Sequence, residues 1–253
     1  MSTETSIAWT DATFNFWMGC VKVSEGCRHC YAEALTTNRM GLSVWGLKAD
    51  RQHVKSVWSN IRKVNAAARA DGRRRRGFVM SLGDFFEDRA DLAPIRAEAW
   101  QAMRTADSID FQVLTKRPEN IARMLPPNWG RGWPNVWLGT TIEDNRVIGR
   151  ADHLRKIPAV VRFVSYEPAI GPLDKLDLAG IDWLIFGGES GPGFRPMNVQ
   201  WARDIRARCQ AAGTAFFFKQ SAGIRTGMGE QLDGAIVREY PTPRVTDGSS
   251  ARD

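Results

Sequence analysis

Short apolar runs typical of β-strands alternate with amphipathic stretches along most of this 253-residue chain. A strand that is buried on both faces reads as a continuous apolar run, and its alternation with helices is typical of a parallel sheet with crossover helices. The expected strands are 13–18, 78–82, 111–115, 136–140, 160–165, 183–187 and 215–218. They predict an α/β fold, a complete or partial (β/α) TIM-like barrel, with a doubly wound open sheet as the alternative.

Amphipathic stretches between these strands predict the crossover helices. The expected helices are 30–39, 52–70, 94–106, 143–156 and 199–212. Gly213 follows the last of them, and glycine commonly ends a helix in a left-handed conformation. A turn at 232–234 predicts a small closing hairpin. We expect residues 1–240 to form a single barrel domain and the polar segment 241–253 to be a disordered tail.

The composition excludes several classes of protein. Apolar residues make up 43% of the chain and charged residues 25%, which is typical of a globular protein and not of a disordered one. No apolar run approaches the roughly 18 residues of a membrane-spanning helix, and the polar N-terminus does not resemble a secretory signal. The four cysteines do not form a secreted disulfide framework. We therefore expect a cytoplasmic protein that does not contact a membrane.

Polar side chains follow almost every expected strand. Because the carboxyl ends of barrel strands meet at one rim, these side chains predict a pocket there. The residues at these positions, two of them glycines, are Gly83 and Asp84, Lys116 and Arg117, Thr140 and Glu143, Ser165 and Glu167, Gly188 and Glu189, and Lys219. The glycine-rich stretch 187–193 matches neither a phosphate loop nor a dinucleotide fingerprint.

Three cysteines, Cys20, Cys27 and Cys30, form the pattern C-x6-C-x2-C just after the first expected strand. Thiolates at this spacing bind a soft metal or an iron–sulfur cluster. A structural zinc site needs four protein ligands, whereas a 4Fe–4S cluster that is held by three thiolates keeps one iron open. The count of three therefore favours a 4Fe–4S cluster held by the loop 19–31.

The spacing of these cysteines is also compatible with zinc binding, with free thiols and with a disulfide. Zinc would need His29 or His53 as its fourth ligand. The thiols can also be free, or Cys27 and Cys30 can form a redox disulfide that leaves Cys20 unexplained. The fourth cysteine, Cys209, lies on the apolar side of a late helix and is expected in the core.

Several motifs together resemble a known family. They are 9–15, Gly19-Cys20, 26–33, 114–118, 187–191, 195–197 and 217–220, and the likeness runs from about Ile7 to Tyr240. In these motifs the chain resembles the phage-type three-cysteine-motif family, named from phage genes of unknown function. That family is itself similar to radical S-adenosylmethionine (SAM) enzymes. Those enzymes usually have C-x3-C-x2-C with an aromatic residue before the last cysteine, where this chain has His29.

The resemblance implies a 4Fe–4S cluster and SAM as cofactors. SAM would bind the open iron, and one electron would cleave it to methionine and a 5′-deoxyadenosyl radical that abstracts a hydrogen from the substrate. Strand order then gives the rim residues their expected roles. The expected cofactor-binding residues are Gly83, Asp84, Thr140, Ser165, Gly188 and Glu189. The expected catalytic residues are Lys116, Glu143, Glu167 and Lys219.

Nucleic acid is the expected substrate class, because the net charge is +7 and the family resembles DNA photoproduct lyases. The expected nucleic-acid contacts are Arg73, Arg74, Arg75, Arg76, Arg117 and Arg131. The arginine run is also typical of a solvated loop. Trp129, Trp133 and Trp137 are able to stack bases, although tryptophans more commonly pack the core.

The resemblance also implies an electron donor of the flavodoxin or ferredoxin type. The sequence leaves open whether a further partner protein completes the site. Two other functions compete with a radical SAM enzyme that modifies or repairs nucleic acid. One is a metal-dependent hydrolase or nuclease that uses Asp84, Glu143, Glu167 and Glu189. The other is a nucleic-acid-binding protein whose cysteines hold a structural cluster or zinc.

Overall fold

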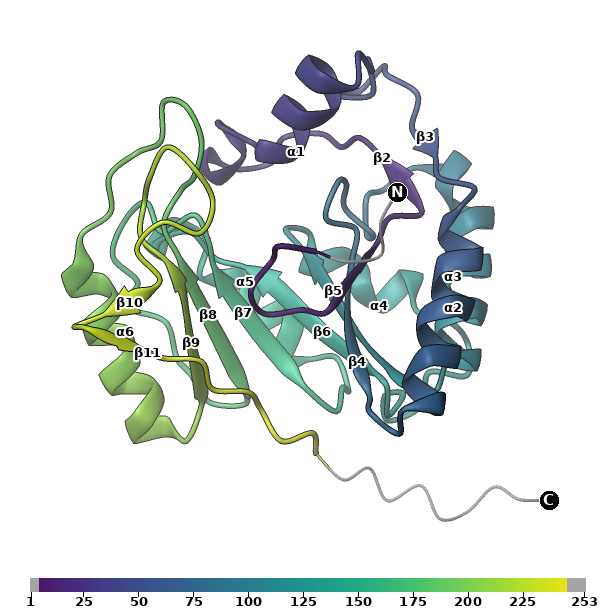
Figure 1. Ribbon diagram of the computed structural model, residues 1–253. Helices are drawn as coiled ribbons and strands as arrows, with labels where there is room; N and C mark the ends of the chain where they lie inside the picture. The colour runs from purple at the N-terminus through teal and green to yellow at the C-terminus, as the bar shows by residue number, and fades with distance from the viewer. Residues whose placement is uncertain (1–4, 245–253) are drawn as a thin grey trace.

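The computed structural model describes residues 5–244, and its centre is one sheet of seven parallel strands (Figure 1). Neighbours in the sheet follow the order of the chain. The strands are β1 (Ala12–Phe14), β4 (Arg75–Val79), β5 (Ile109–Thr115), β6 (Val136–Thr141), β7 (Arg162–Tyr166), β8 (Trp183–Gly187) and β9 (Ala215–Gln220). The sheet curls, and its edge strands β1 and β9 do not pair with each other. The predicted partial barrel is confirmed, and the doubly wound alternative is wrong because its strand order would reverse.

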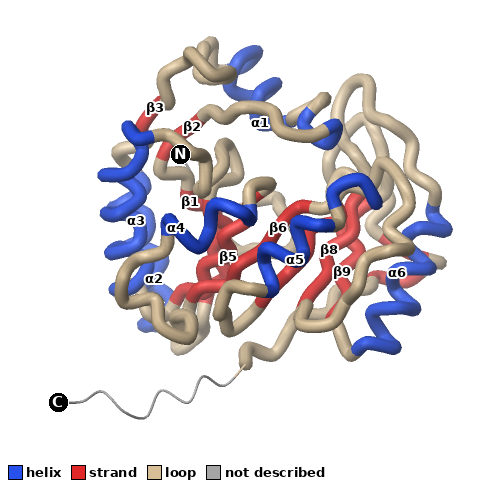
Figure 2. The backbone as a smooth tube through the Cα atoms, turned by 180° about the vertical axis from the view of Figure 1, so that it is seen from behind, coloured by secondary structure: helices blue, strands red, loops and turns tan. Residues whose placement is uncertain are grey.

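Helices cover the outer face of the curled sheet (Figure 2). They are α2 (Val57–Ala70), α3 (Ala93–Thr105), α4 (Ile121–Met124), α5 (Gly149–Arg155) and α6 (Val199–Ala212). The remaining helix, α1 (Tyr31–Ala34), runs into a π-helical turn (Leu35–Arg39) and lies above the sheet. Short 3-10 turns cover Glu25–Cys27, Ala90–Leu92, Pro118–Asn120 and Asn145–Val147. Small antiparallel pairs join β2 (Trp17–Met18) to β3 (Gln52–His53) and β10 (Gln231–Leu232) to β11 (Ala235–Ile236).

The sequence predicted some element bounds well and others poorly. Strand β8 and helix α6 have the predicted bounds, and α6 is followed by Gly213 with a φ of 70°. The single strand expected at 13–18 is wrong, because the chain divides there into β1 and β2. Asn15 lies between them, and its side-chain oxygen accepts a bond from the Leu82 N–H at 2.7 Å. The helix expected from 143 starts at Gly149, because Asp144 accepts the Arg146 N–H and caps a 3-10 turn instead.

The inside of the barrel is filled by aromatic side chains near the amino ends of the strands. Trp9, which precedes β1, contacts Phe78, Phe163 and Trp183 with ring centroids 4.6, 6.4 and 6.1 Å away. Trp137 belongs to the same buried cluster. This cluster fills the amino end of the barrel, and ligands of such barrels bind at the carboxyl end.

The tryptophans considered for base stacking lie in the core instead. Trp129 is 5% exposed and Trp133 8%, and both contact Trp100 on the outer side of the sheet, at 5.6 and 5.8 Å. Trp137 is buried inside the barrel. The expectation that tryptophans mainly pack the core is confirmed for these three.

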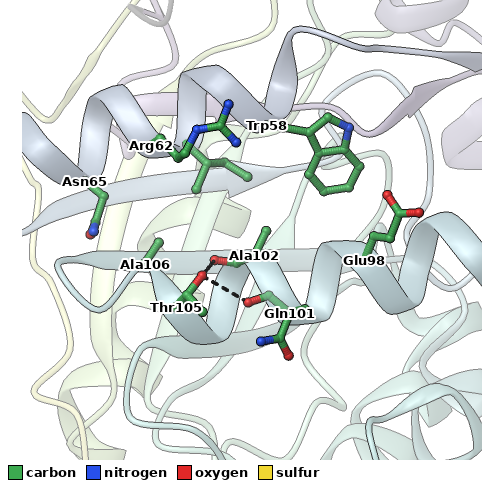
Figure 3. Close-up of a pocket in the computed structure, with 9 residues that line it drawn as sticks. Trp58, Arg62, Asn65, Glu98, Gln101, Ala102, Thr105 and Ala106 are labelled. Atoms are coloured by element: carbon green, nitrogen blue, oxygen red, sulfur yellow. Dashed lines mark hydrogen bonds between the residues drawn. The ribbon is translucent and has the colours of Figure 1, made fainter.

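Two helices on the outer face border a groove of about 340 Å³ (Figure 3). Trp58 and Ile61 of α2 line one side, and Ala102 and Thr105 of α3 line the other. The Thr105 hydroxyl bonds back to carbonyls of its own helix. The groove therefore belongs to the packing of the outer layer and not to the rim.

The C-terminal segment is described only as far as residue 244. The Arg244 N–H donates to the Val160 carbonyl at 2.8 Å, and its guanidinium pairs with Asp182 at 2.7 Å. Of the tail expected to be disordered, 241–253, the structure describes only 241–244, and the rest of that expectation lies outside the described residues. Within 5–244, no helix is both long enough and apolar enough to span a membrane.

Candidate functional site

The cysteine loop, residues 19–31, lies across the carboxyl end of the sheet. Figure 1 shows it in purple at the top of the molecule, next to the green loop that follows β8. The loop starts at Gly19, whose N–H donates to the Leu82 carbonyl at 2.9 Å. Gly19 has a φ of 104°, and a Cβ there would lie 2.1 Å from the Val44 carbonyl oxygen. Only glycine fits this position, so the start of the loop is fixed by the backbone.

Cys20 lies beside a buried ion pair that joins the ends of β4 and β5. Arg117 Nη1 donates to Asp84 Oδ2 at 2.8 Å and to Cys20 Sγ at 3.3 Å, while Nη2 donates to the Val21 carbonyl at 2.7 Å. Asp84 also accepts the Thr115 hydroxyl at 2.6 Å. Burial opposes the charged form of Arg117, but Asp84, Cys20 and Glu87 together outweigh it, so the pKa of Arg117 is raised.

Glu143, at the end of β6, holds the middle of the loop. Its Oε1 accepts the Ser24 hydroxyl at 2.9 Å and lies 3.5 Å from Lys116 Nζ, and its Oε2 accepts from Arg150 Nη1 at 2.8 Å. A Cβ on Gly26 would lie 2.4 Å from Glu143 Cγ. The glycine before the second cysteine therefore lets the loop pack directly on this side chain.

Glu189, at the end of β8, holds the last part of the loop. Its Oε2 lies 3.0 Å from His29 Nδ1 and accepts from Arg195 Nε at 2.9 Å. Arg195 also reaches back to the loop, where its Nη1 donates to the Glu25 carbonyl at 3.1 Å. Burial alone would raise the pKa of Glu189, but its bonds to Arg195 and His29 lower it. Glu189 is therefore ionised and joins two rim loops.

A fourth ion pair lies at the rim, and neither of its two residues belongs to the cysteine loop. Lys219 of β9 pairs with Glu167, which follows β7. The side chains of Lys219 and Glu167 are 11% and 22% exposed, and that of Lys116 is 22% exposed. These three side chains are thus reachable by a ligand at the mouth of the barrel, whereas Asp84, Glu143 and Glu189 are almost fully buried.

The three cysteines of the loop are free thiols, so the disulfide between Cys27 and Cys30 is not formed. Burial raises the pKa of Cys20 to about 12, and Asp84 adds to this rise while Arg117 opposes it. Burial also raises the pKa of Cys30. Both thiols are protonated at neutral pH, and binding of a metal would release these protons.

The arrangement of the loop cysteines decides which metal group they can hold. Between residues 5 and 244, no three or more His, Cys, Asp or Glu side chains are placed to share a single metal ion. His29 bonds to Glu189 and His53 lies exposed in β3, so the predicted zinc site with either histidine is not formed. A 4Fe–4S cluster is different, because each thiolate binds its own iron. Three free thiols in one loop match that donor set.

The structure places the remaining expected cofactor residues at the rim, in different surroundings. Gly83 bridges to Gly19, and a Cβ on it would lie 3.0 Å from the Gly19 carbonyl oxygen. The Thr140 hydroxyl donates to the Thr115 carbonyl at 3.0 Å within the sheet. Ser165 is 2% exposed. A Cβ on Gly188 would lie 2.2 Å from the Ala222 nitrogen, so this glycine lets two rim loops pack together.

The arginine run lies at the opposite end of the sheet from the cysteine loop, at the start of β4. Arg74 pairs with Asp110, Arg75 with Asp71 and Arg76 with Asp11. Arg131 is exposed in the loop before β6, also near the amino ends of the strands. The structure therefore does not bring these arginines to the rim, and a role in binding nucleic acid stays a prediction for them.

Sequence reasoning missed several residues that shape the site. Arg150 and Arg195 each neutralise a rim carboxylate, and Ser24 joins the cysteine loop to β6. Arg195 lies in the motif 195–197, but spacing does not predict its partner. His29, a candidate zinc ligand by its sequence position, bonds to a carboxylate instead.

The comparisons with known proteins agree with this geometry. A protein family of unknown function (DUF5131) matches residues 4–241. The chain belongs to this family. No curated protein sequence matches it. The finer identification as a phage-type three-cysteine-motif protein stays a prediction.

Two solved structures of spore photoproduct lyase variants share the fold. One has bound AdoMet and a dinucleoside spore photoproduct, and the other has the dinucleoside spore photoproduct. Each is 14% identical with a TM-score of 0.50, and the match covers 82% of this chain. This chain spans only 63% of the lyase chain. The likeness shows a partial barrel of the radical SAM type and no more than the fold.

Proposed function

We propose that this protein binds a 4Fe–4S cluster and SAM and acts as a radical SAM-type enzyme on a nucleic acid or a nucleotide-containing substrate. The observation that carries the proposal is the position of the cysteine loop. It lies over the open end of a partial barrel and contacts the segments after β4, β5, β6 and β8. A lyase with bound AdoMet and a dinucleoside photoproduct has the same fold, which supports the choice of cofactor and substrate class.

Cys20, Cys27 and Cys30 would hold the cluster. When bound with SAM, such a cluster supplies a 5′-deoxyadenosyl radical by one-electron cleavage of SAM. The protein's own contribution is to orient the ligands and exclude water. Asp84, Glu143 and Glu189 fix the loop through the buried contacts described above. The aromatic cluster around Trp9 closes the other end of the barrel, so a radical formed at the rim would be shielded from water on that side.

Lys116, Glu167 and Lys219 are the rim side chains left to face a substrate. The ammonium groups of Lys116 and Lys219 suit the phosphates of a nucleotide, and their pairs with Glu143 and Glu167 hold them in place until a phosphate competes. Gly83, Gly188 and Ser165 lie at the same rim, where the two glycines let the rim loops pack closely, and a role in binding SAM stays a prediction for them. If the reaction takes place on a base in a strand, that base must leave the stack to reach the barrel.

The test is anaerobic reconstitution with iron and sulfide. We expect brown protein with about four irons per chain, and release of 5′-deoxyadenosine from SAM that depends on dithionite. Cys27→Ala is expected to abolish iron binding, while Cys209→Ala, in the core of α6, is the matched control and should retain it. Equal loss of iron in both variants would refute the ligand assignment. Colourless protein with one zinc per chain would favour a binding protein with a structural metal.

Substrate class is tested separately. A single-stranded oligonucleotide, irradiated or not, should increase the release of 5′-deoxyadenosine, whereas inorganic polyphosphate of equal charge should not. Stimulation by polyphosphate alone would show that charge and not the nucleotide is recognised. An electron donor of the flavodoxin or ferredoxin type would replace dithionite in the cell.

A further inference from the structure

We propose that Arg117 is a positioning residue that donates a charged hydrogen bond to the sulfur of Cys20 and thereby raises the reduction potential of the metal group held by the cysteine loop. The inference rests on the proposed function and goes beyond it. Arg117 had been expected to contact phosphate. The structure turns its guanidinium into the protein and towards Cys20.

The donors of Arg117 are already engaged. The residue is 7% exposed. Its Nη1 lies 3.3 Å from Cys20 Sγ and 2.8 Å from Asp84 Oδ2, and its Nη2 lies 2.7 Å from the Val21 carbonyl oxygen. A guanidinium has a fixed planar arrangement of donors, so three partners hold it in one orientation. A phosphate at the rim would have to break these bonds to bind here.

The pair of Arg117 and Asp84 beside Cys20 belongs to a larger buried group of charges. Behind Arg117 lies a second buried pair, in which Arg51 Nη2 bonds to Glu87 Oε1 at 2.7 Å. Arg96 is buried beside them and bonds to backbone carbonyls of residues 85 and 87. Three guanidinium groups thus face two carboxylates, and all five residues are at most 7% exposed. Arg96 bonds to carbonyls and to neither carboxylate of this group, and only Arg117 of the three guanidinium groups bonds to Cys20.

The effect on the metal group follows from its charge. One-electron reduction adds a negative charge to a cluster and its sulfur ligands. A cation within hydrogen-bond distance of a ligand sulfur stabilises that added charge, and hydrogen bonds to sulfur are a recognised means of tuning cluster potentials. The electron comes from an external one-electron donor, which is dithionite in the experiment below. Arg117 therefore favours the reduced state.

The experiment measures the midpoint potential of the reconstituted protein by dithionite titration followed by electron paramagnetic resonance. Arg117→Gln removes the charge and keeps a planar amide donor. We expect it to lower the reduction equilibrium constant about tenfold, which is about 59 mV for one electron. Arg117→Lys keeps the charge but has a single donor group, and a smaller shift in the same direction is expected.

The matched control is Arg150→Gln, which removes another rim guanidinium, one that bonds to Glu143 and to the Thr141 carbonyl and has no hydrogen bond to a cysteine. Its potential should equal that of the wild type. A wild-type potential in Arg117→Gln, or the same shift in Arg150→Gln, would overturn the proposal and leave Arg117 only a partner of Asp84. If Arg117→Gln does not retain iron, Arg117→Lys decides by the same measurement. Absence of iron from the wild type would instead refute the proposed function.

Discussion

The buried pair between Arg51 and Glu87 is expected to support the whole rim, and its removal is the strongest test of how the cysteine loop is held. Arg51 Nε and Nη2 bond to both carboxylate oxygens of Glu87, at 2.9 and 2.7 Å. Its Nη1 donates to the carbonyls of Val44 and Ala49, each at 2.8 Å. Arg51 therefore fixes the segment that packs on the start of the loop at Gly19.

Glu87→Ala would leave the Arg51 guanidinium buried without its carboxylate partner. Both side chains are almost fully buried, with exposures of 0% and 4%, so solvent cannot replace the lost bonds. Breaking such a pair costs about 3–5 kcal/mol, out of a total stability of about 5–15 kcal/mol. At roughly 2–4 °C per kcal/mol for a domain of this size, the midpoint of thermal unfolding should fall by about 6–20 °C.

Circular dichroism of the metal-free protein during heating measures this change. Asp88→Ala is the control, because it breaks the Arg123 pair whose side chains are 51% and 67% exposed, and an exposed pair contributes about 0–1 kcal/mol. The double variant Arg51→Met with Glu87→Leu should recover most of the loss, since it leaves no unpaired buried charge. A fall of less than 2 °C in Glu87→Ala would refute the reasoning.

Three further predictions concern the loop and the fold. Gly26→Ala should lower the iron retained after reconstitution, because its Cβ would lie 2.4 Å from Glu143 Cγ; unchanged iron content would show that the loop moves freely. Arg195→Gln removes the bridge from Glu189 to the loop, and alkylation of the loop cysteines by iodoacetamide in metal-free protein should become several-fold faster; an unchanged rate would exclude this bridge as a restraint. Gly213→Ala should lower the unfolding free energy by about 1 kcal/mol in urea, because its φ is 70°, and an equal or higher stability would contradict this.

The arrangement of strands was predictable because buried parallel strands and their helices leave a periodic pattern. In six of the seven sheet strands, both ends lie within three residues of the ends of the predicted apolar run. For β8 the predicted and observed ends are the same. The rim residues were predictable for the same reason, since each lies at the carboxyl end of a strand or in the segment that follows it. The division of 13–18 was not, because it depends on a bond from Asn15 to Leu82, far away in the sequence.

The pairing of the rim charges could not be predicted from the sequence. Arg117 and Lys116 are adjacent cations in one motif, yet Arg117 is directed to Asp84 and Cys20 while Lys116 lies near Glu143. Which way each side chain points depends on the curl of the sheet and on the path of the cysteine loop. The exposed arginine run shows the same limit, because its partners Asp11 and Asp110 are set by packing and not by spacing.

The paired rim also bears on the choice between a radical enzyme and a metal-dependent hydrolase. A hydrolase of that kind needs carboxylates that are free to bind divalent cations. Here Asp84, Glu143, Glu167 and Glu189 each bond to an arginine or lysine of the same rim. A metal would have to displace four cations to use them. The carboxylates instead hold the loop and the rim cations in place, which leaves the sulfurs of the three loop cysteines as the donors available to a metal group there.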